Sequence, residues 1–322
     1  MTVTPVAPAS RSSLRDYVGL ARPDHWFKNV FMVPGVVLAW TASGRPSFTP
    51  LVTALVLATV SACLVASSNY TLNEWLDAAE DRQHPEKRFR PAAAGRIRAP
   101  LAYLQWIGLG LAGLVLGRAV SPGFFWSAFA LFVMGIIYNV SPLRSKDRAY
   151  IDALSESVNN PLRLLMGWYV LDPGLVPPAS LLLAYWMMGA FFVAMKRFSE
   201  LRHINNSVVA GAYRKSFRHY TPERLLISVV FYATAFGLFG GIFVIRYRVE
   251  LVLAVPFVAG LMAMYMHLGL LPNSPAQHPE ALFRHPGFVA YGCVTAIVLI
   301  VCSVIRLPWM DRLFETTIPS GL

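Results

Sequence analysis

The sequence from residue 51 to residue 81 reads LVTALVLATVSACLVASSNYTL and then NEWLDAAED. Residues 51–72 contain no charged side chain, and their number matches the roughly 20 residues that an α-helix needs to cross a bilayer. Residues 73–81 place several acidic side chains directly after that run. An uncharged run that ends in a group of acids predicts a transmembrane helix with a polar site at the membrane edge.

Comparable apolar runs occur along the whole chain of 322 residues and predict an all-α fold. Charged residues make up only 14% of the chain, whereas soluble domains contain about 25%. The mean hydropathy of +0.50 also indicates a chain surrounded mostly by lipid. We therefore predict a polytopic integral membrane bundle of about nine transmembrane helices. They are expected near residues 30–40, 51–72, 101–119, 124–140, 151–171, 181–195, 225–245, 251–271 and 287–305.

The charged loops predict the orientation of this bundle. The formal net charge is +11, and Lys and Arg residues gather in the loops after the second, fourth and sixth predicted spans. The positive-inside rule places these loops, the N-terminus and the active site in the cytoplasm, and the C-terminus outside. Topology and anionic ligands account for the positive charge, so we expect membrane lipid and no nucleic acid as a partner. The sequence thus predicts a multi-pass protein of the cell membrane, either plasma or inner.

No polar linker long enough to separate two domains is visible, so we expect one transmembrane helical catalytic domain over residues 14–310. Residues 1–13 are polar and rich in Pro and Ser, without an apolar core. They are therefore predicted to form a disordered cytoplasmic tail and not a cleavable signal peptide. Residues 311–322 are predicted to form a short C-terminal tail. The oligomeric state, including a homo-oligomer, stays open.

The acidic stretch after the second predicted span predicts a metal site. Asn73, Asp77 and Asp81 recur every four residues, so a helix aligns them along one stripe. Two carboxylates and an amide oxygen suit Mg²⁺, which keeps its other positions for water and substrate phosphate. The alternative is a solvated helix end whose acids pair with the arginines that follow. The position at a membrane edge favours the metal. Glu74 and Glu80 lie off this stripe and are interpreted as ordinary surface charges.

The fifth predicted span carries a second group of polar residues. The steps from Asp152 to Glu156, Asn160 and Arg163 place these side chains on roughly one helical face. Charged groups inside a membrane span are energetically unfavourable and need a reason to be there. Two interpretations stay open. The group is either a structural ion pair that holds this span to its neighbours, or a polar wall that binds an acceptor head group or ribose hydroxyls.

Asn73, Asp77 and Asp81 match the first aspartate-rich motif, N-x-x-x-D-x-x-x-D, of the UbiA superfamily of membrane prenyltransferases, and the chain resembles that family. The resemblance covers essentially the whole chain, because the family has nine transmembrane helices. It implies that these three residues hold Mg²⁺ against a donor diphosphate. The family's second motif, D-x-x-x-D, is expected after the sixth span, where residues 195–202 read MKRFSELR. Cations largely replace its acids, so we expect direct Lys and Arg contacts to phosphate and no second metal clamp.

Residues 22–29 (RPDHWFKN), 84–91 (HPEKRFRP), 196–200 and 213–221 resemble one branch of that family, the decaprenyl-phosphate phosphoribosyltransferases. The resemblance implies transfer of 5-phosphoribose from phosphoribosyl diphosphate to a polyprenyl (decaprenyl) phosphate with Mg²⁺. The predicted catalytic residues are Asp77, Asp81, Lys196 and Glu200. The predicted substrate-binding residues are Arg22, Lys28, Lys87, Arg88, Arg90, Tyr138, Lys146, Glu156, Asn160, Arg163 and Arg197. Arg22 and Lys28 are expected to hold the acceptor's phosphate.

Two other functions remain as alternatives. The first is a prenyltransferase that moves a prenyl group from a prenyl diphosphate to an aromatic or other small acceptor, with the same metal stripe. The second is a transporter of a phosphorylated solute. Transporters often show paired broken helices at the membrane midplane. No such pair is visible in this sequence, and its charges gather on one face, which favours an enzyme.

Overall fold

The computed structural model describes residues 12–43, 48–82, 87–171, 174–277 and 279–314. These residues form helices and turns without a strand, which confirms the predicted all-α fold. Seven helical spans are long and apolar enough to cross a membrane. They are α3 (Phe48–Leu76), α5 (Ala99–Val120), α6 (Pro122–Asn139), α9 (Ala179–Ile204), α11 (Pro222–Tyr247), η5 with α12 (Val249–Ala254 and Val255–Leu270), and α13 (Pro286–Val304).

The two remaining predicted spans are present but divided into shorter helices. The first consists of the 3₁₀ helix η1 (Pro23–Met32) followed by α2 (Val33–Ala42), and the fifth consists of α7 (Ile151–Ser157) followed by α8 (Asn159–Trp168). Pro161 explains the second break, because it has no N–H for the Ser157 carbonyl and its ring crowds that group. The predicted count of about nine therefore holds approximately. Broken spans do exist here, contrary to the sequence-based expectation.

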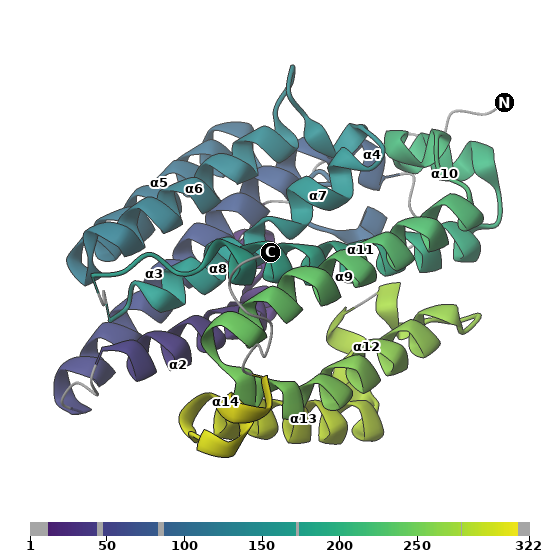
Figure 1. Ribbon diagram of the computed structural model, residues 1–322. Coiled ribbons are helices and arrows are strands. Elements are labelled where there is room, and N and C mark those ends of the chain that lie inside the picture. Colours follow the sequence, from purple (N-terminus) through teal and green to yellow (C-terminus); the bar gives the residue numbers. More distant parts are fainter. Residues whose placement is uncertain (1–11, 44–47, 83–86, 172–173, 278, 315–322) are drawn as a thin grey trace, which may run out of the picture.

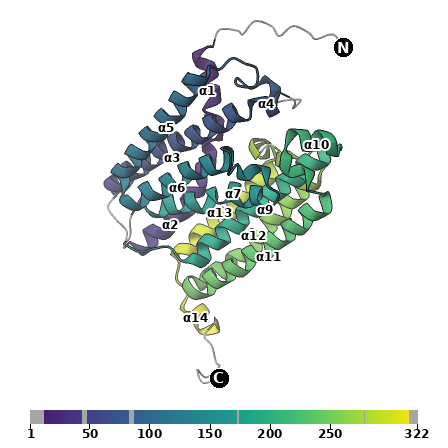
Figure 2. The ribbon, with the colours of Figure 1, turned by 90° about the horizontal axis from the view of Figure 1, so that it is seen from above.

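The helices form two groups with the divided spans between them (Figure 1). In the first group, α3 packs against α5 and α6, and in the second, α9 packs against α11 and contacts α12. The fifth span joins the groups, because α7 and α8 both contact α9 while α8 also contacts α6 and α2. Figure 2 shows α4 (Ala78–Asp81) and α10 (Ser207–Tyr213) at one end of the bundle and α14 (Pro308–Phe314) at the other.

Small residues allow the first span to approach the fifth closely. A methyl group built at Gly35 of α2 would lie 2.1 Å from the Leu164 carbonyl oxygen, and one at Gly167 of α8 would lie 1.9 Å from the Met32 carbonyl oxygen. Any larger residue at either place would push the two spans apart. This crossing therefore determines how far η1, which carries Lys28, lies from α8, which carries Arg163.

The outer surface of the bundle is apolar, as expected for helices that face lipid. Leu111 and Val115 of α5 are 58% and 70% exposed, and Phe231 of α11 is 63% exposed. Such a surface would promote aggregation of a soluble protein but suits a lipid environment. The chain is a multi-pass membrane protein. Of the predicted tails, residues 1–11 and 315–322 lie outside the described residues, and the predicted boundary at residue 310 falls within α14.

Candidate active site

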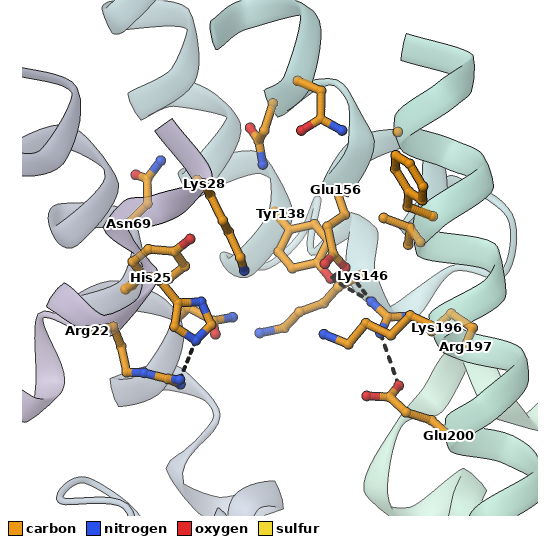
Figure 3. Close-up of a pocket in the computed structure, with 18 of the residues that line it drawn as sticks. Arg22, His25, Lys28, Asn69, Tyr138, Lys146, Glu156, Lys196, Arg197 and Glu200 are labelled. Carbon is orange, nitrogen blue, oxygen red and sulfur yellow. Dashed lines mark hydrogen bonds and ion pairs between the residues drawn. The ribbon is translucent and has the colours of Figure 1, made fainter. Parts of the chain in front are cut away.

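A cavity of about 670 Å³ opens between the two helix groups at the end of the bundle that holds α4 and α10 (Figure 3). All but one of the predicted site residues line it. The lining residues from the prediction are Arg22, Lys28, Asn73, Asp77, Asp81, Lys87, Arg90, Tyr138, Lys146, Glu156, Asn160, Arg163, Lys196, Arg197 and Glu200. Residues separated by more than 150 positions in the sequence thus meet at one place.

Arg88 is the exception. It is exposed, its guanidinium lies 4.8 Å from the ring centroid of Phe89, and it does not line the cavity. The short 3₁₀ helix η2 (Lys87–Phe89) turns the two neighbouring cations in different directions. Lys87 lines the cavity and donates a hydrogen bond to the Tyr213 hydroxyl of α10. The structure therefore does not support the predicted substrate-binding role of Arg88.

The predicted stripe of oxygen ligands forms at the end of α3. Helical hydrogen bonds continue through the break after Leu76, since the Asp77 N–H donates to the Asn73 carbonyl (3.0 Å) and the Asp81 N–H donates to the Asp77 carbonyl (2.8 Å). The Asn73 side-chain amide donates to Asp77 Oδ2 at 3.1 Å and to Asn139 Oδ1 at 2.6 Å. The stripe therefore faces the cavity as one continuous row.

Cations already pair with both aspartates of the stripe. Asp77 Oδ1 accepts hydrogen bonds from Lys146 Nζ and, at 3.1 Å, from Arg144. Asp81 Oδ2 forms a salt bridge with Arg90 at 2.9 Å. Burial raises the pKa of the Asp81 carboxyl, although Arg90 opposes that shift. Burial also lowers the pKa of Lys146 to about 8, against the opposite effect of Asp77.

These contacts determine how well a metal fits the stripe. Within the described part of the chain, no three His, Cys, Asp or Glu side chains are grouped as a metal site. The donor set is instead two carboxylates and the Asn73 amide, which matches a Mg²⁺ ion that takes few protein ligands. Lys146, Arg144 and Arg90 supply the positive charge that such an ion would bring. The oxygen donors are of the chemical type that Mg²⁺ prefers. The ion would compete with these cationic side chains for the aspartates.

Glu74 is a cavity residue that the sequence analysis interpreted wrongly. Its side chain is only 2% exposed, it lines the cavity, and neither carboxylate oxygen has a hydrogen-bond partner. Glu80 also lines the cavity and pairs with Arg144 at 3.1 Å. Neither is an ordinary surface charge. The sequence did contain a signal for Glu74, because residues 74, 77 and 81 follow the i, i+3, i+7 spacing of a single helical face.

Arg197 of α9 is the centre of a buried ion network (Figure 3). It is 2% exposed and pairs with Glu156, with Glu200 at 3.1 Å and with Asp152 at 3.4 Å. The Tyr138 hydroxyl donates to Glu156 at 2.9 Å. For Asp152 and Glu156, the geometry therefore agrees with the structural ion-pair interpretation of the fifth span.

Arg163 does not join that network. It donates from Nε to Asn29 Oδ1 at 3.1 Å and from one terminal nitrogen to the Asn159 carbonyl at 3.4 Å. Both partners are neutral. The helical face that the sequence predicted as one polar unit therefore divides into an ion-paired part near the mouth and an arginine further along the span.

The loops after α6 and α9 add cations that the sequence analysis did not assign. Arg214 donates to the Tyr138 hydroxyl at 2.8 Å and lies 3.4 Å from Asp152. Lys215 pairs with Asp147 at 3.0 Å, which joins the two loops across the mouth of the cavity. Arg214 falls inside the stretch 213–221 that carried part of the family resemblance, so this stretch was the available signal.

Comparison with known proteins decides the family. Residues 30–292 match the UbiA prenyltransferase family. This chain belongs to the UbiA prenyltransferase family. It is 27% identical over 235 residues to the decaprenyl-phosphate phosphoribosyltransferase of Mycolicibacterium smegmatis, and the match covers 72% of this chain and 70% of the relative. It is 30% identical over 214 residues to the protein of the same name from Mycobacterium tuberculosis, with 66% and 68% covered.

The fold of this UbiA-family transferase is also similar to a solved structure of a UbiA homolog from Archaeoglobus fulgidus bound to DMAPP and Mg²⁺. The TM-score is 0.67 at 18% sequence identity, and the match covers 92% of this chain and 99% of the other. The predicted family resemblance is thereby confirmed. In this UbiA-family transferase, Lys196, Arg197 and Glu200 line the cavity where the family's second acidic motif is expected.

Proposed function

We propose that this transferase moves 5-phosphoribose from phosphoribosyl diphosphate to a polyprenyl phosphate with Mg²⁺. The observation that carries this proposal is the excess of positive charge in the cavity. Lys28 and Lys196 lie on opposite walls and point into the same space as Lys146 (Figure 3). Neither Lys28 nor Lys196 forms a salt bridge with a described carboxylate. A donor with an additional phosphate group would match such a surplus better than a prenyl diphosphate.

The stripe and the neighbouring cations would bind the donor in different ways, the stripe through Mg²⁺ and the cations directly. Asn73, Asp77 and Asp81 would hold Mg²⁺, which supplies electrostatic stabilisation of the leaving diphosphate. Lys87 and Arg90 lie beside the stripe and would contact phosphate oxygens directly. Their fixed positive charges would stabilise the negative charge that develops as the bond between C1 of the ribose and the diphosphate oxygen breaks.

The acceptor supplies the nucleophile in this reaction. One oxygen of the polyprenyl phosphate forms the new bond to C1, while the electron pair of the broken bond leaves with diphosphate. That oxygen is already anionic, so no strong general base is needed. Lys196 would contact the donor, and Glu200 would act as a positioning residue through its 3.1 Å salt bridge with Arg197.

The charge distribution supports a cytoplasmic active site. Cavity cations such as Arg90, Arg144 and Arg214 come from loops that the positive-inside rule places in the cytoplasm, together with the N-terminus. A site at that membrane face would take a water-soluble donor from the cytoplasm and a lipid acceptor from the bilayer. The two mycobacterial relatives named decaprenyl-phosphate phosphoribosyltransferase support the same pair of substrates.

A second candidate function is prenyl transfer to an aromatic or other small acceptor. The observation in its favour is the apolar part of the cavity, which includes Phe192, Leu261 and Phe288 and suits a prenyl chain. The DMAPP of the Archaeoglobus fulgidus structure would enter such a site as the donor. The cations at residues 196 and 197 count against this candidate.

One assay separates the two candidates. Purified protein in detergent with Mg²⁺ receives labelled phosphoribosyl diphosphate and polyprenyl phosphate, or a prenyl diphosphate and an aromatic acid. We expect a lipid-linked ribose phosphate from the first pair and no product from the second. Asp77→Asn should abolish this product, whereas Asp311→Asn in α14, at the other end of the bundle, should not. A prenylated aromatic product alone would overturn the proposal in favour of the second candidate.

A further inference from the structure

Arg163 lies at the inner end of the cavity. It is 6% exposed, and beyond it no residue of α8 lines the cavity. It follows Glu156 by seven positions (163 − 156) along the divided fifth span. Arg163 therefore lies further along the fifth span than the acids that pair with Arg197.

The guanidinium of Arg163 has no counter-charge in the described part of the chain. Its hydrogen-bond partners, which are Asn29 Oδ1, the Asn159 carbonyl and the Tyr70 hydroxyl, are neutral. The two acids of the same span, Asp152 and Glu156, pair with Arg197 instead. An arginine keeps its charge in a protein and carries five N–H donors but no acceptor. A buried charge of this kind calls for an anion that arrives with the substrate.

A second cation, Lys28, shares the neighbour Tyr70 with Arg163. Lys28 of η1 points into the cavity, and its ammonium lies 5.6 Å from the ring centroid of Tyr70. Tyr70 of α3 also interacts with Arg163. One aromatic side chain therefore contacts both cations. The close crossing of α2 and α8 at Gly35 and Gly167 holds η1 against α8.

The surroundings of this pair determine the chemistry of its ligand. The cavity wall also includes Phe31 of η1, which carries Lys28, together with Leu261 of α12 and Ala296 of α13. A donor bound at the aspartate stripe has no apolar part to place there. A phosphate monoester on an isoprenoid chain has both parts, because its oxygens match the fork of an arginine and its chain matches the apolar wall.

We propose that Lys28 and Arg163 form a second anion site, which binds the phosphate of the lipid acceptor at the inner end of the cavity. This inference rests on the proposed function and identifies where that acceptor binds. Lys28 points into the same space as Lys146 and Lys196 of the donor site, so a phosphate held by Lys28 and Arg163 would approach the reacting carbon from the membrane side. Ribose hydroxyls are a poorer match, because an arginine offers them no acceptor atom.

The test measures binding of an isoprenyl monophosphate in the absence of turnover. Farnesyl phosphate is titrated into the purified full chain in detergent by calorimetry, without Mg²⁺ or donor, and farnesol serves as the uncharged comparison. We expect Arg163→Gln to weaken farnesyl phosphate binding at least 10-fold and to leave farnesol binding unchanged. Asp77→Asn should bind farnesyl phosphate like the wild type, and Mg²⁺ with inorganic diphosphate should not displace it.

Two results would overturn the acceptor site: equal binding of farnesyl phosphate by Arg163→Gln and the wild type, or displacement by inorganic diphosphate. If Arg163→Gln does not fold, a protection experiment on the wild-type protein tests the site instead. Phenylglyoxal modification of Arg163, mapped by mass spectrometry, should be slowed by farnesyl phosphate and not by farnesol; equal protection by both contradicts the site. If Arg163-dependent binding is found but no ribose transfer occurs, the proposed function fails and the anion site stands.

Discussion

Lys146, in the loop after α6, donates a hydrogen bond to Asp77 Oδ1, one of the oxygens assigned to the metal. Lys146 also donates to Asn139 Oδ1 at 2.8 Å, and Asn139 in turn accepts from Asn73. The lysine therefore contacts the stripe directly and would compete with a metal ion for the Asp77 carboxylate.

This competition predicts an unusual effect of Lys146→Gln. Removal of the ammonium leaves Arg144 as the cation that still pairs with Asp77 Oδ1, so we expect tighter Mg²⁺ binding, by about 10-fold for one lost charge–charge contact. The same change should lower kcat/KM for the donor by about 100-fold, because a cation that stabilises phosphate is gone. Calorimetric titration of Mg²⁺ and steady-state kinetics measure the two effects. Weaker Mg²⁺ binding in this variant would show that Lys146 and the metal do not share Asp77.

The burial of Glu74 predicts that its replacement raises thermal stability and lowers activity. Its buried carboxylate has no hydrogen-bond partner, and its replacement by Gln keeps the shape while it removes a buried charge. We expect Glu74→Gln to raise the Tm by about 2 °C or more and to lower activity at least about 10-fold. Asp311→Asn, at an exposed position in α14, is the acid-to-amide control and should change neither. An unchanged Tm together with full activity would remove Glu74 from the site.

Lys196 and Arg197 are neighbours for which we predict opposite roles. Arg197→Met leaves Glu156, Glu200 and Asp152 without their shared partner, so it should destabilise the fold by about 3–5 kcal/mol. Lys196→Met breaks no salt bridge to a described residue and should leave the Tm unchanged or higher. It should raise the donor KM, because the lost charge faces the cavity. Thermal unfolding and kinetics on both variants separate these roles; a large loss of Tm in Lys196→Met contradicts them.

The crossing of the first and fifth spans predicts a sharp difference between two glycines. Gly167→Ala places a methyl group against the Met32 carbonyl, so we expect a loss of about 1–3 kcal/mol and weaker substrate binding, since Lys28 and Arg163 move apart. Gly108→Ala in α5 meets no atom within 4 Å and should stabilise its helix by up to about 1 kcal/mol. Tm values of both variants in the same detergent provide the comparison. If both variants unfold at the wild-type temperature, the crossing is looser than described.

Much of the fold followed from the sequence because membrane helices obey local rules. Long uncharged runs predict spans one at a time, and seven of them form helices of membrane length. The stripe of Asn73, Asp77 and Asp81 was equally accessible, since a spacing of four residues aligns side chains on any helix. The family resemblance added the kind of chemistry. Its site residues then met in one cavity, with the exception of Arg88.

What only the tertiary structure decided was which charges meet. Asp152, Glu156 and Arg163 looked like one polar face, yet Arg197, from another span, pairs with the first two and leaves the third with neutral partners. Glu74 looked like a surface charge until the packing of the bundle buried it. Helical periodicity is a property of neighbouring residues, and a sequence displays it directly. Burial and ion pairing depend on helices that lie far apart in the sequence, and only their packing determines which side chains come within reach of one another.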